Sequence, residues 1–255
     1  MSKLATAIAL AGALLSGSAT AESAKPTIVL VHGAFADSSS WNGVAGILQK
    51  DGYRVVAAAN PLRSVASDAA YVSDVVKSIE GPVVLVGHSY GGAVISAAAN
   101  GHDNVKSLVY VAAFAPDAGE TAAELAGKFP GGTLGSALAA PVTLADGGVD
   151  LYIDQAKFRE QFAHDVPAQE AALMAAGQRP ITEAALNEKA GAPAWKSLPA
   201  WFVYGSADKN IPAKALGFMA ERAGSRRTVV VEGASHVVMV SQPQAVADLI
   251  EEAAQ

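Results

Sequence analysis

A serine between two glycines is the first candidate for chemistry in this chain. Ser89 is the centre of Gly87-His88-Ser89-Tyr90-Gly91, which follows an apolar run at residues 82–86 and precedes small, apolar residues at helical spacing. A serine on such a tight strand-to-helix turn is held in a strained conformation that exposes its hydroxyl, and the glycines let the strand and the helix approach closely. The pattern predicts a nucleophilic serine, with the Tyr90 N–H aimed at a developing oxyanion.

Two further residues could complete this chemistry. Asp208 and His236 follow the serine in the chain, and each comes just after a predicted strand. A serine hydroxyl is a weak nucleophile, so it needs a base such as His236, and the histidine needs a carboxylate such as Asp208 to fix its tautomer and stabilise its cation. The structural alternatives are a helix N-cap at Asp208 and a hydrogen-bonded loop histidine at His236. The order Ser, Asp, His at three strand ends favours a catalytic triad.

The elements that must position these residues alternate between strands and helices. We expect helices between strands at residues 27–31, 53–59, 82–86, 105–114, 199–204 and 227–231. This alternation predicts an α/β fold with a mostly parallel six-stranded sheet, joined by right-handed crossovers and flanked by helices. Sites in such sheets form beyond the carboxyl ends of the strands, which is where Ala34, Ser89, Asp208 and His236 fall.

Residues 117–198 interrupt the alternation and contain no strong candidate for a parallel strand. Thr121 and Glu124 form a capping-box pattern at the start of a short helix. Asp146-Gly147-Gly148 between two short β-branched runs is typical of a small hairpin, and short helices are expected after it. We therefore expect a mainly helical lid at residues 117–198, inserted between core segments at 22–116 and 199–255.

The composition disfavours several classes of function. The chain has 255 residues, no cysteine and a net charge of −6 without a basic cluster. The absence of cysteine excludes disulfides and thiolate metal sites. The negative charge disfavours binding to nucleic acid or to anionic membranes. No residue spacing is typical of a metal site, and no glycine-rich loop carries a phosphate-binding lysine. We expect a small-molecule substrate, with neither a metal nor a cofactor.

The N-terminal residues are typical of a secretory signal peptide. Lys3 precedes an uncharged, apolar run at residues 4–15, and Ala19-Thr20-Ala21 matches a cleavage site. The apolar run is too short to span a membrane as a stable anchor. We expect removal of residues 1–21 and a periplasmic or secreted protein; the alternative is an uncleaved N-terminal helix.

Four segments together resemble the α/β-hydrolase superfamily, and within it the compact branch of plant methylesterases, hydroxynitrile lyases and their bacterial esterase-like relatives. These segments are His32-Gly33-Ala34-Phe35, Gly87-His88-Ser89-Tyr90-Gly91-Gly92, Gly205-Ser206-Ala207-Asp208 and Ser235-His236. The resemblance covers residues 27–114 and 199–250. It implies that the N–H groups of Ala34 and Tyr90 form the oxyanion hole. It also implies that Ser89, Asp208 and His236 form the triad.

Two departures from the lyase members favour hydrolysis. The resemblance implies that those lyases carry a threonine where this chain has Gly33, and a lysine where it has Val237. A lyase acting on cyanohydrins needs a cation for the departing cyanide, which valine does not supply. We expect a secreted serine esterase that cleaves small carboxylic esters. The alternatives are C–C bond hydrolysis, perhydrolysis or lyase chemistry on the same fold, and a non-catalytic binding protein.

Apolar and aromatic residues near the motifs and in the lid are candidate substrate contacts. For the lid residues, packing within the lid is the alternative to contact with a ligand. The selected candidates are Phe35, His88, Phe158, Phe162, Trp195 and Val237; Phe129, Leu134 and Met174 are further apolar lid residues.

Overall fold

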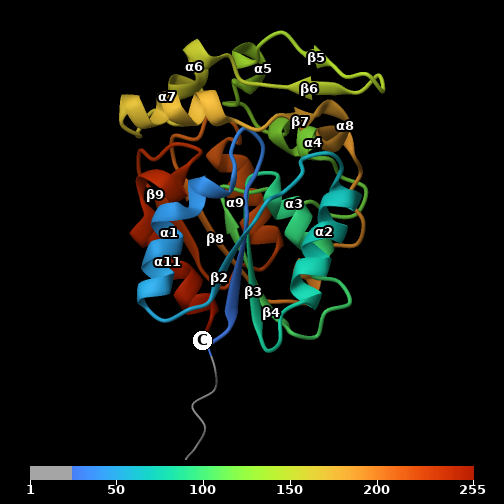
Figure 1. The fold of residues 1–255 in the computed structure, drawn as a ribbon, viewed down its shortest axis with the longest axis vertical. Helices are drawn as coiled ribbons and strands as arrows, with labels where there is room; N and C mark the ends of the chain where they lie inside the picture. The colour runs from blue at the N-terminus through green and yellow to red at the C-terminus, as the bar shows by residue number, and fades with distance from the viewer. Residues whose placement is uncertain (1–24) are drawn as a thin grey trace, which may run out of the picture.

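A six-stranded parallel sheet lies at the centre of the computed structural model, which describes residues 25–255 (Figure 1). The predicted signal peptide at residues 1–21 lies outside the described residues. Every neighbouring pair of strands in the order β2-β1-β3-β4-β8-β9 is parallel, so the predicted sheet is confirmed. Its strands are β1 (Thr27–Val31), β2 (Val55–Ala58), β3 (Val83–His88), β4 (Val105–Val111), β8 (Ala200–Gly205) and β9 (Thr228–Val231).

The central strands are continuous apolar runs because both faces of the sheet are covered by helices. Every residue of β1 and β3 is buried. The two strands pair from Thr27 opposite Val83 to Val31 opposite Gly87. Their carboxyl ends therefore lie side by side, and this places the loop that begins at His32 next to Ser89.

Two groups of helices cover the sheet. Helices α2 and α3 pack together, and α1 and α11 pack together with α10 beside them. Helix α2 begins at Val65, directly after Ser64, whose side chain caps it by accepting the Ser67 N–H. The helices of the core are η1 (Ser38–Trp41), α1 (Asn42–Lys50), α2 (Val65–Lys77), α3 (Gly91–Ala98), α9 (Ala213–Arg222), α10 (Val238–Ser241) and α11 (Pro243–Ala253).

The segment between β4 and β8 forms a layer beyond one end of the core (Figure 1). The capping box of Thr121 and Glu124 is present, and β5 pairs antiparallel with β6 as the hairpin pattern predicts. A third short strand, β7, extends this pair and was not expected. The layer contains α4 (Ala122–Gly127), α5 (Leu134–Ala137), β5 (Val142–Thr143), β6 (Val149–Leu151), α6 (Gln155–Phe162), α7 (Ala168–Gly177), β7 (Ile181–Thr182), α8 (Glu183–Asn187) and η2 (Ala194–Lys196).

Between residues 25 and 255, none of the helices combines the length and the apolar character that crossing a membrane requires.

Candidate active site

Ser89 lies on a sharp turn between β3 and α3, with φ at +53°. This left-handed conformation is unfavourable for a residue with a side chain and is typical of a functional turn. The turn needs its two glycines: a Cβ on Gly87 would lie 2.5 Å from the Gly91 oxygen, and one on Gly91 would lie 2.5 Å from the Val31 oxygen. Strand β3, helix α3 and strand β1 therefore approach one another at the serine in a way that other residues would block.

Asp208 and His236 are in direct contact at the ends of β8 and β9. His236 Nδ1 lies 2.6 Å from Asp208 Oδ2, and neither side chain is exposed. The other oxygen, Asp208 Oδ1, accepts hydrogen bonds from the N–H groups of Asn210 at 2.8 Å and Ile211 at 2.9 Å. The aspartate thus closes a turn in the loop before α9, whose N-cap is Pro212 rather than Asp208, and contacts the histidine with its second oxygen.

The second ring nitrogen of His236 is buried and has no hydrogen-bond partner among the described residues. Ser89 makes no side-chain hydrogen bond to it in this structure, although such contacts often tighten only when substrate binds. His88, which precedes the serine, lies with its ring centroid 4.8 Å from that of His236. Its Nε2 donates to the His236 carbonyl oxygen at 3.1 Å. Burial lowers the pKa of His88 well below its usual value, which favours the neutral form of this ring.

The backbone N–H groups of Ala34 and Tyr90 are free beside Ser89. Neither donates to any residue of the described chain, whereas Phe35 N–H donates to the Arg179 oxygen at 2.9 Å and Ser89 N–H to the Val111 oxygen at 3.2 Å. Ala34 and Tyr90 line the same cavity as Ser89. Two free donors at one cavity wall have the arrangement that an oxyanion hole requires.

The side chain of Tyr90 points away from this cavity, into the core. Its hydroxyl donates to Asp68 Oδ2 at 3.0 Å, and both residues are buried. The Asp68 carboxylate also accepts the Arg63 N–H, and the Arg63 guanidinium binds Asp150 of β6 at 2.7 Å. A chain of polar contacts therefore joins the turn at Ser89 to the layer above the sheet.

A cavity of about 360 Å³ opens beside Ser89. Its volume is within the range of small-molecule sites, and its walls are mostly apolar. Helix α4 contributes small residues, which leave the space open. The lining residues are Ala34, Phe35, Ser89, Tyr90, Phe114, Ala122, Ala123, Ala126, Gly127, Gly132, Leu134, Gly135, Leu138, Leu186, Asn210 and Ile211.

Of the selected substrate contacts, the structure brings only Phe35 to this cavity. Phe162 is fully buried between its neighbours, with ring centroids 5.2 Å from His236 and 5.0 Å from Phe158. Trp195 is buried where its Nε1 donates to the Pro116 oxygen at 3.0 Å. His88, Phe158, Phe162, Trp195 and Val237 all lie outside the cavity lining, because they pack behind the site or within the core.

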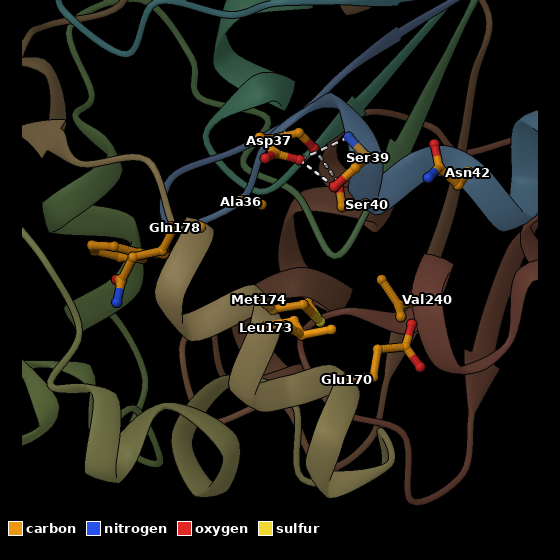
Figure 2. A pocket seen from close by; sticks show the side chains of 12 residues that line it. Ala36, Asp37, Ser39, Ser40, Asn42, Glu170, Leu173, Met174, Gln178 and Val240 are labelled. Carbon is orange, nitrogen blue, oxygen red and sulfur yellow. Dashed lines mark hydrogen bonds between the residues drawn. The ribbon is translucent and has the colours of Figure 1, made fainter.

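Phe35 also lines a second cavity, of about 240 Å³, outside the first. Figure 2 shows α7 on one side of this cavity, with Glu170, Leu173 and Met174, and the η1 region on the other. Asp37 is held there by its hydrogen bond from the Ser39 N–H at 2.7 Å. Ser89 does not line this space, and Phe35 is the one residue that lines both cavities.

Sequence reasoning did not select Asn210 or Phe114, which line the cavity beside Ser89. Asn210 follows Asp208 by two residues at the same strand end, and this position was an available signal. Leu134, one of the further lid residues, does line the cavity. Among residues 25–255, no cluster of three or more histidine, aspartate or glutamate side chains is arranged to hold a metal ion.

Known proteins share this sequence pattern and this fold. An alpha-hydroxynitrile lyase of Arabidopsis thaliana is 26% identical over 246 residues, covering 88% of this chain and 95% of the lyase. A carbendazim hydrolyzing esterase of Nocardioides sp. is 36% identical over 109 residues, covering 36% and 44% of the two chains. The crystal structure of polyneuridine aldehyde esterase matches with a TM-score of 0.78 at 18% identity, over 91% of this chain and all of that chain.

These relatives include both esterases and a lyase. The solved structure of polyneuridine aldehyde esterase shares the fold described above. The model of the alpha/beta hydrolase family matches residues 28–249, which is nearly the whole described chain. The chain therefore belongs to the alpha/beta hydrolase family.

Proposed function

We propose that this protein is a serine esterase that cleaves small, neutral carboxylic esters through Ser89, His236 and Asp208. The observation that carries the proposal is the 2.6 Å contact between His236 Nδ1 and Asp208 Oδ2, which leaves His236 Nε2 unpartnered beside the turn of Ser89. A buried carboxylate in this position holds the histidine in the tautomer that accepts a proton at Nε2.

The reaction follows from these positions. Ser89 Oγ attacks the ester carbonyl carbon while His236 Nε2 takes the hydroxyl proton, and Asp208 stabilises the resulting imidazolium. The carbonyl oxygen becomes an oxyanion that accepts hydrogen bonds from the N–H groups of Ala34 and Tyr90. The C–O bond then breaks, the alcohol leaves with the proton from His236, and an acyl group remains on Ser89. Water attacks this acyl-enzyme by the same route, which releases the acid and restores the serine.

Lyase chemistry is the second candidate, because a hydroxynitrile lyase is among the relatives. Two features favour hydrolysis. Val237 is fully buried, and no lysine or arginine lines the cavity beside Ser89, so a departing cyanide ion would have no cation beside it. A Cβ on Gly33 would lie 2.5 Å from Ser89 Cβ, so a threonine at this position would displace the nucleophile.

The test compares both reactions on one preparation. We expect hydrolysis of p-nitrophenyl acetate, labelling by a fluorophosphonate at Ser89, and no cyanide release from mandelonitrile above the buffer rate. Ser89→Ala should lower kcat by roughly 10⁴-fold or more while the melting temperature is retained. A variant that keeps more than a tenth of the esterase activity would show that another nucleophile acts. Serine-dependent cyanide release faster than ester turnover would establish the lyase instead.

We also propose that the protein acts after export, with residues 1–21 removed. The proposal rests on the lysine, apolar run and small-residue cleavage site of the sequence. Intact-mass analysis of protein from the periplasm or medium of the native host should find a chain that begins at Glu22. A cytoplasmic protein that retains Met1 would contradict this.

A further inference from the structure

The cavity beside Ser89 is apolar except at two side chains. Most of its walls are alanine, glycine, leucine, isoleucine and phenylalanine, and none of the lining residues is charged. The hydroxyl of Tyr90 is turned away and bonded to Asp68. Among the lining residues this leaves Ser89, the proposed nucleophile, and Asn210 as the side chains with polar groups available to a ligand.

The orientation of the Asn210 amide is determined by its neighbours. Gln161 Nε2 lies 2.9 Å from the backbone oxygen of Lys209, which can only accept, so this atom of Gln161 is the donor. The same nitrogen lies 2.7 Å from the Asn210 side chain, so the atom it meets there must be the acceptor Oδ1. Thr133 completes the arrangement, because its hydroxyl donates to Gln161 Oε1 at 2.8 Å.

This network leaves the Asn210 amide nitrogen as a free donor. Asn210 is only 5% exposed, yet no described residue accepts a hydrogen bond from its Nδ2. Nδ2 is not among the side-chain nitrogens that the described residues enclose completely, so this donor is accessible to water or to a ligand that can accept from it. Asn210 lines the cavity that contains Ser89, so a ligand in that cavity is the candidate acceptor for this hydrogen bond.

We infer that Asn210 is a specificity residue that donates from Nδ2 to a second oxygen of the substrate, away from the ester that is cleaved. The inference rests on the proposed esterase function. The substrates it selects are apolar, uncharged esters that carry a further hydrogen-bond acceptor, such as a keto oxygen. A charged substrate does not fit, because the cavity lining offers no opposite charge.

Two matched pairs of esters test the inference on either side of the scissile bond. The first pair is p-nitrophenyl 5-oxohexanoate and p-nitrophenyl hexanoate, followed by nitrophenol release. The second is 5-oxohexyl acetate and hexyl acetate, followed by acid release. The wild-type protein should prefer the keto member of at least one pair by about 3- to 10-fold in kcat/KM, the effect of one neutral hydrogen bond.

Asn210→Leu removes the donor and should bring this ratio to about one. Asn210→Asp keeps the acceptor for Gln161 but loses the Nδ2 donor, so it should also abolish the preference, and it is the variant to use if the leucine variant does not fold. Leu186→Val, which changes an apolar lining residue, is the matched control and should leave the ratio of the two substrates unchanged.

The outcomes separate this inference from the proposed function. A wild-type protein that is not labelled by the fluorophosphonate and cleaves none of the four esters would refute both. A protein that is labelled and cleaves them without a keto preference in either pair would refute only the role of Asn210. Retention of the preference in both Asn210 variants would also refute that role.

Discussion

Tyr90→Phe is the substitution that best tests how the nucleophile turn is held. It removes one hydroxyl, which donates to Asp68 Oδ2 at 3.0 Å where both side chains are buried. The ring keeps its place, so the change leaves the packing of the turn intact. The backbone N–H of residue 90, proposed for the oxyanion hole, is retained as well.

The magnitude depends on the charge of the acceptor. A hydrogen bond to a charged group contributes about 1.5–3 kcal/mol to the free energy of unfolding, whereas a neutral bond contributes about 1 kcal/mol. Tyr110→Phe is the matched control, because the Tyr110 hydroxyl pairs at 2.7 Å with the neutral Ser96 hydroxyl in an equally buried place. For a chain of this size, a loss of about 2 kcal/mol lowers the melting temperature by about 4–8 °C.

The two variants should differ in their pH dependence. Burial raises the pKa of Asp68 above its ordinary value, and the hydrogen bonds from Arg63 and Tyr90 oppose this rise. When folding raises the pKa of a carboxyl group, that group stabilises the folded protein at any pH below the pKa it has in the unfolded chain. This contribution is lost as the pH rises through the pKa that the group has in the folded protein. Tyr90→Phe raises the folded pKa further. Its penalty should therefore grow from about pH 4 to neutral pH, while the Tyr110→Phe penalty should stay constant.

Urea unfolding of the wild type and both variants between pH 4 and pH 8 measures these penalties. We expect Tyr90→Phe to cost more than Tyr110→Phe at pH 7 and the two costs to converge at pH 4. The explanation is refuted if Tyr90→Phe costs no more than Tyr110→Phe at pH 7, or if its cost does not change with pH. Asp68→Asn combined with Tyr90→Phe should be less destabilised than the sum of the single variants, because both remove the same contact.

Two further variants address the site itself. Asp208→Asn should lower kcat for p-nitrophenyl acetate by roughly 10³- to 10⁴-fold, because an amide no longer fixes the His236 tautomer; unchanged turnover would mean that another carboxylate orients the base. Phe35 lines both the cavity of about 360 Å³ and that of about 240 Å³. We expect Phe35→Ala to connect them and so to shift the kcat/KM optimum toward longer acyl chains in a series of p-nitrophenyl esters from acetate to decanoate. An unchanged chain-length profile would contradict this expectation.

Local sequence patterns were sufficient to predict the sheet and the turn at its centre. Continuous apolar runs such as residues 27–31 are buried strands because helices cover both of their faces. Gly87 and Gly91 predicted a close approach of strand and helix, and a Cβ on either one would indeed overlap the opposing backbone. The strands and the serine turn depend on a few residues that are neighbours in the sequence, and each pattern is compatible with one local conformation. They can therefore be predicted from the sequence alone.

Other features depend on partners far away in the sequence. Helix α2 begins at Val65. The N–H groups of Val65 and Ala66 in its first turn donate to the carboxylate of Glu188, which is far away in the sequence. The short strand β7 exists only because β6 offers it an edge. The start of α2 and the existence of β7 therefore depend on contacts with distant segments as well as on their own residues.

The sequence by itself determined the family motifs, the order of the strands along the chain and the candidate triad residues at their ends. Only the tertiary structure decided which side chains share the cavity with Ser89. Phe162 and Trp195 are as apolar as a substrate contact should be, yet they pack behind the site, while Asn210 lines it. The physical reason is that the hydropathy of a residue indicates whether its side chain is buried. Which residues surround that side chain depends on how segments far apart in the sequence pack against one another.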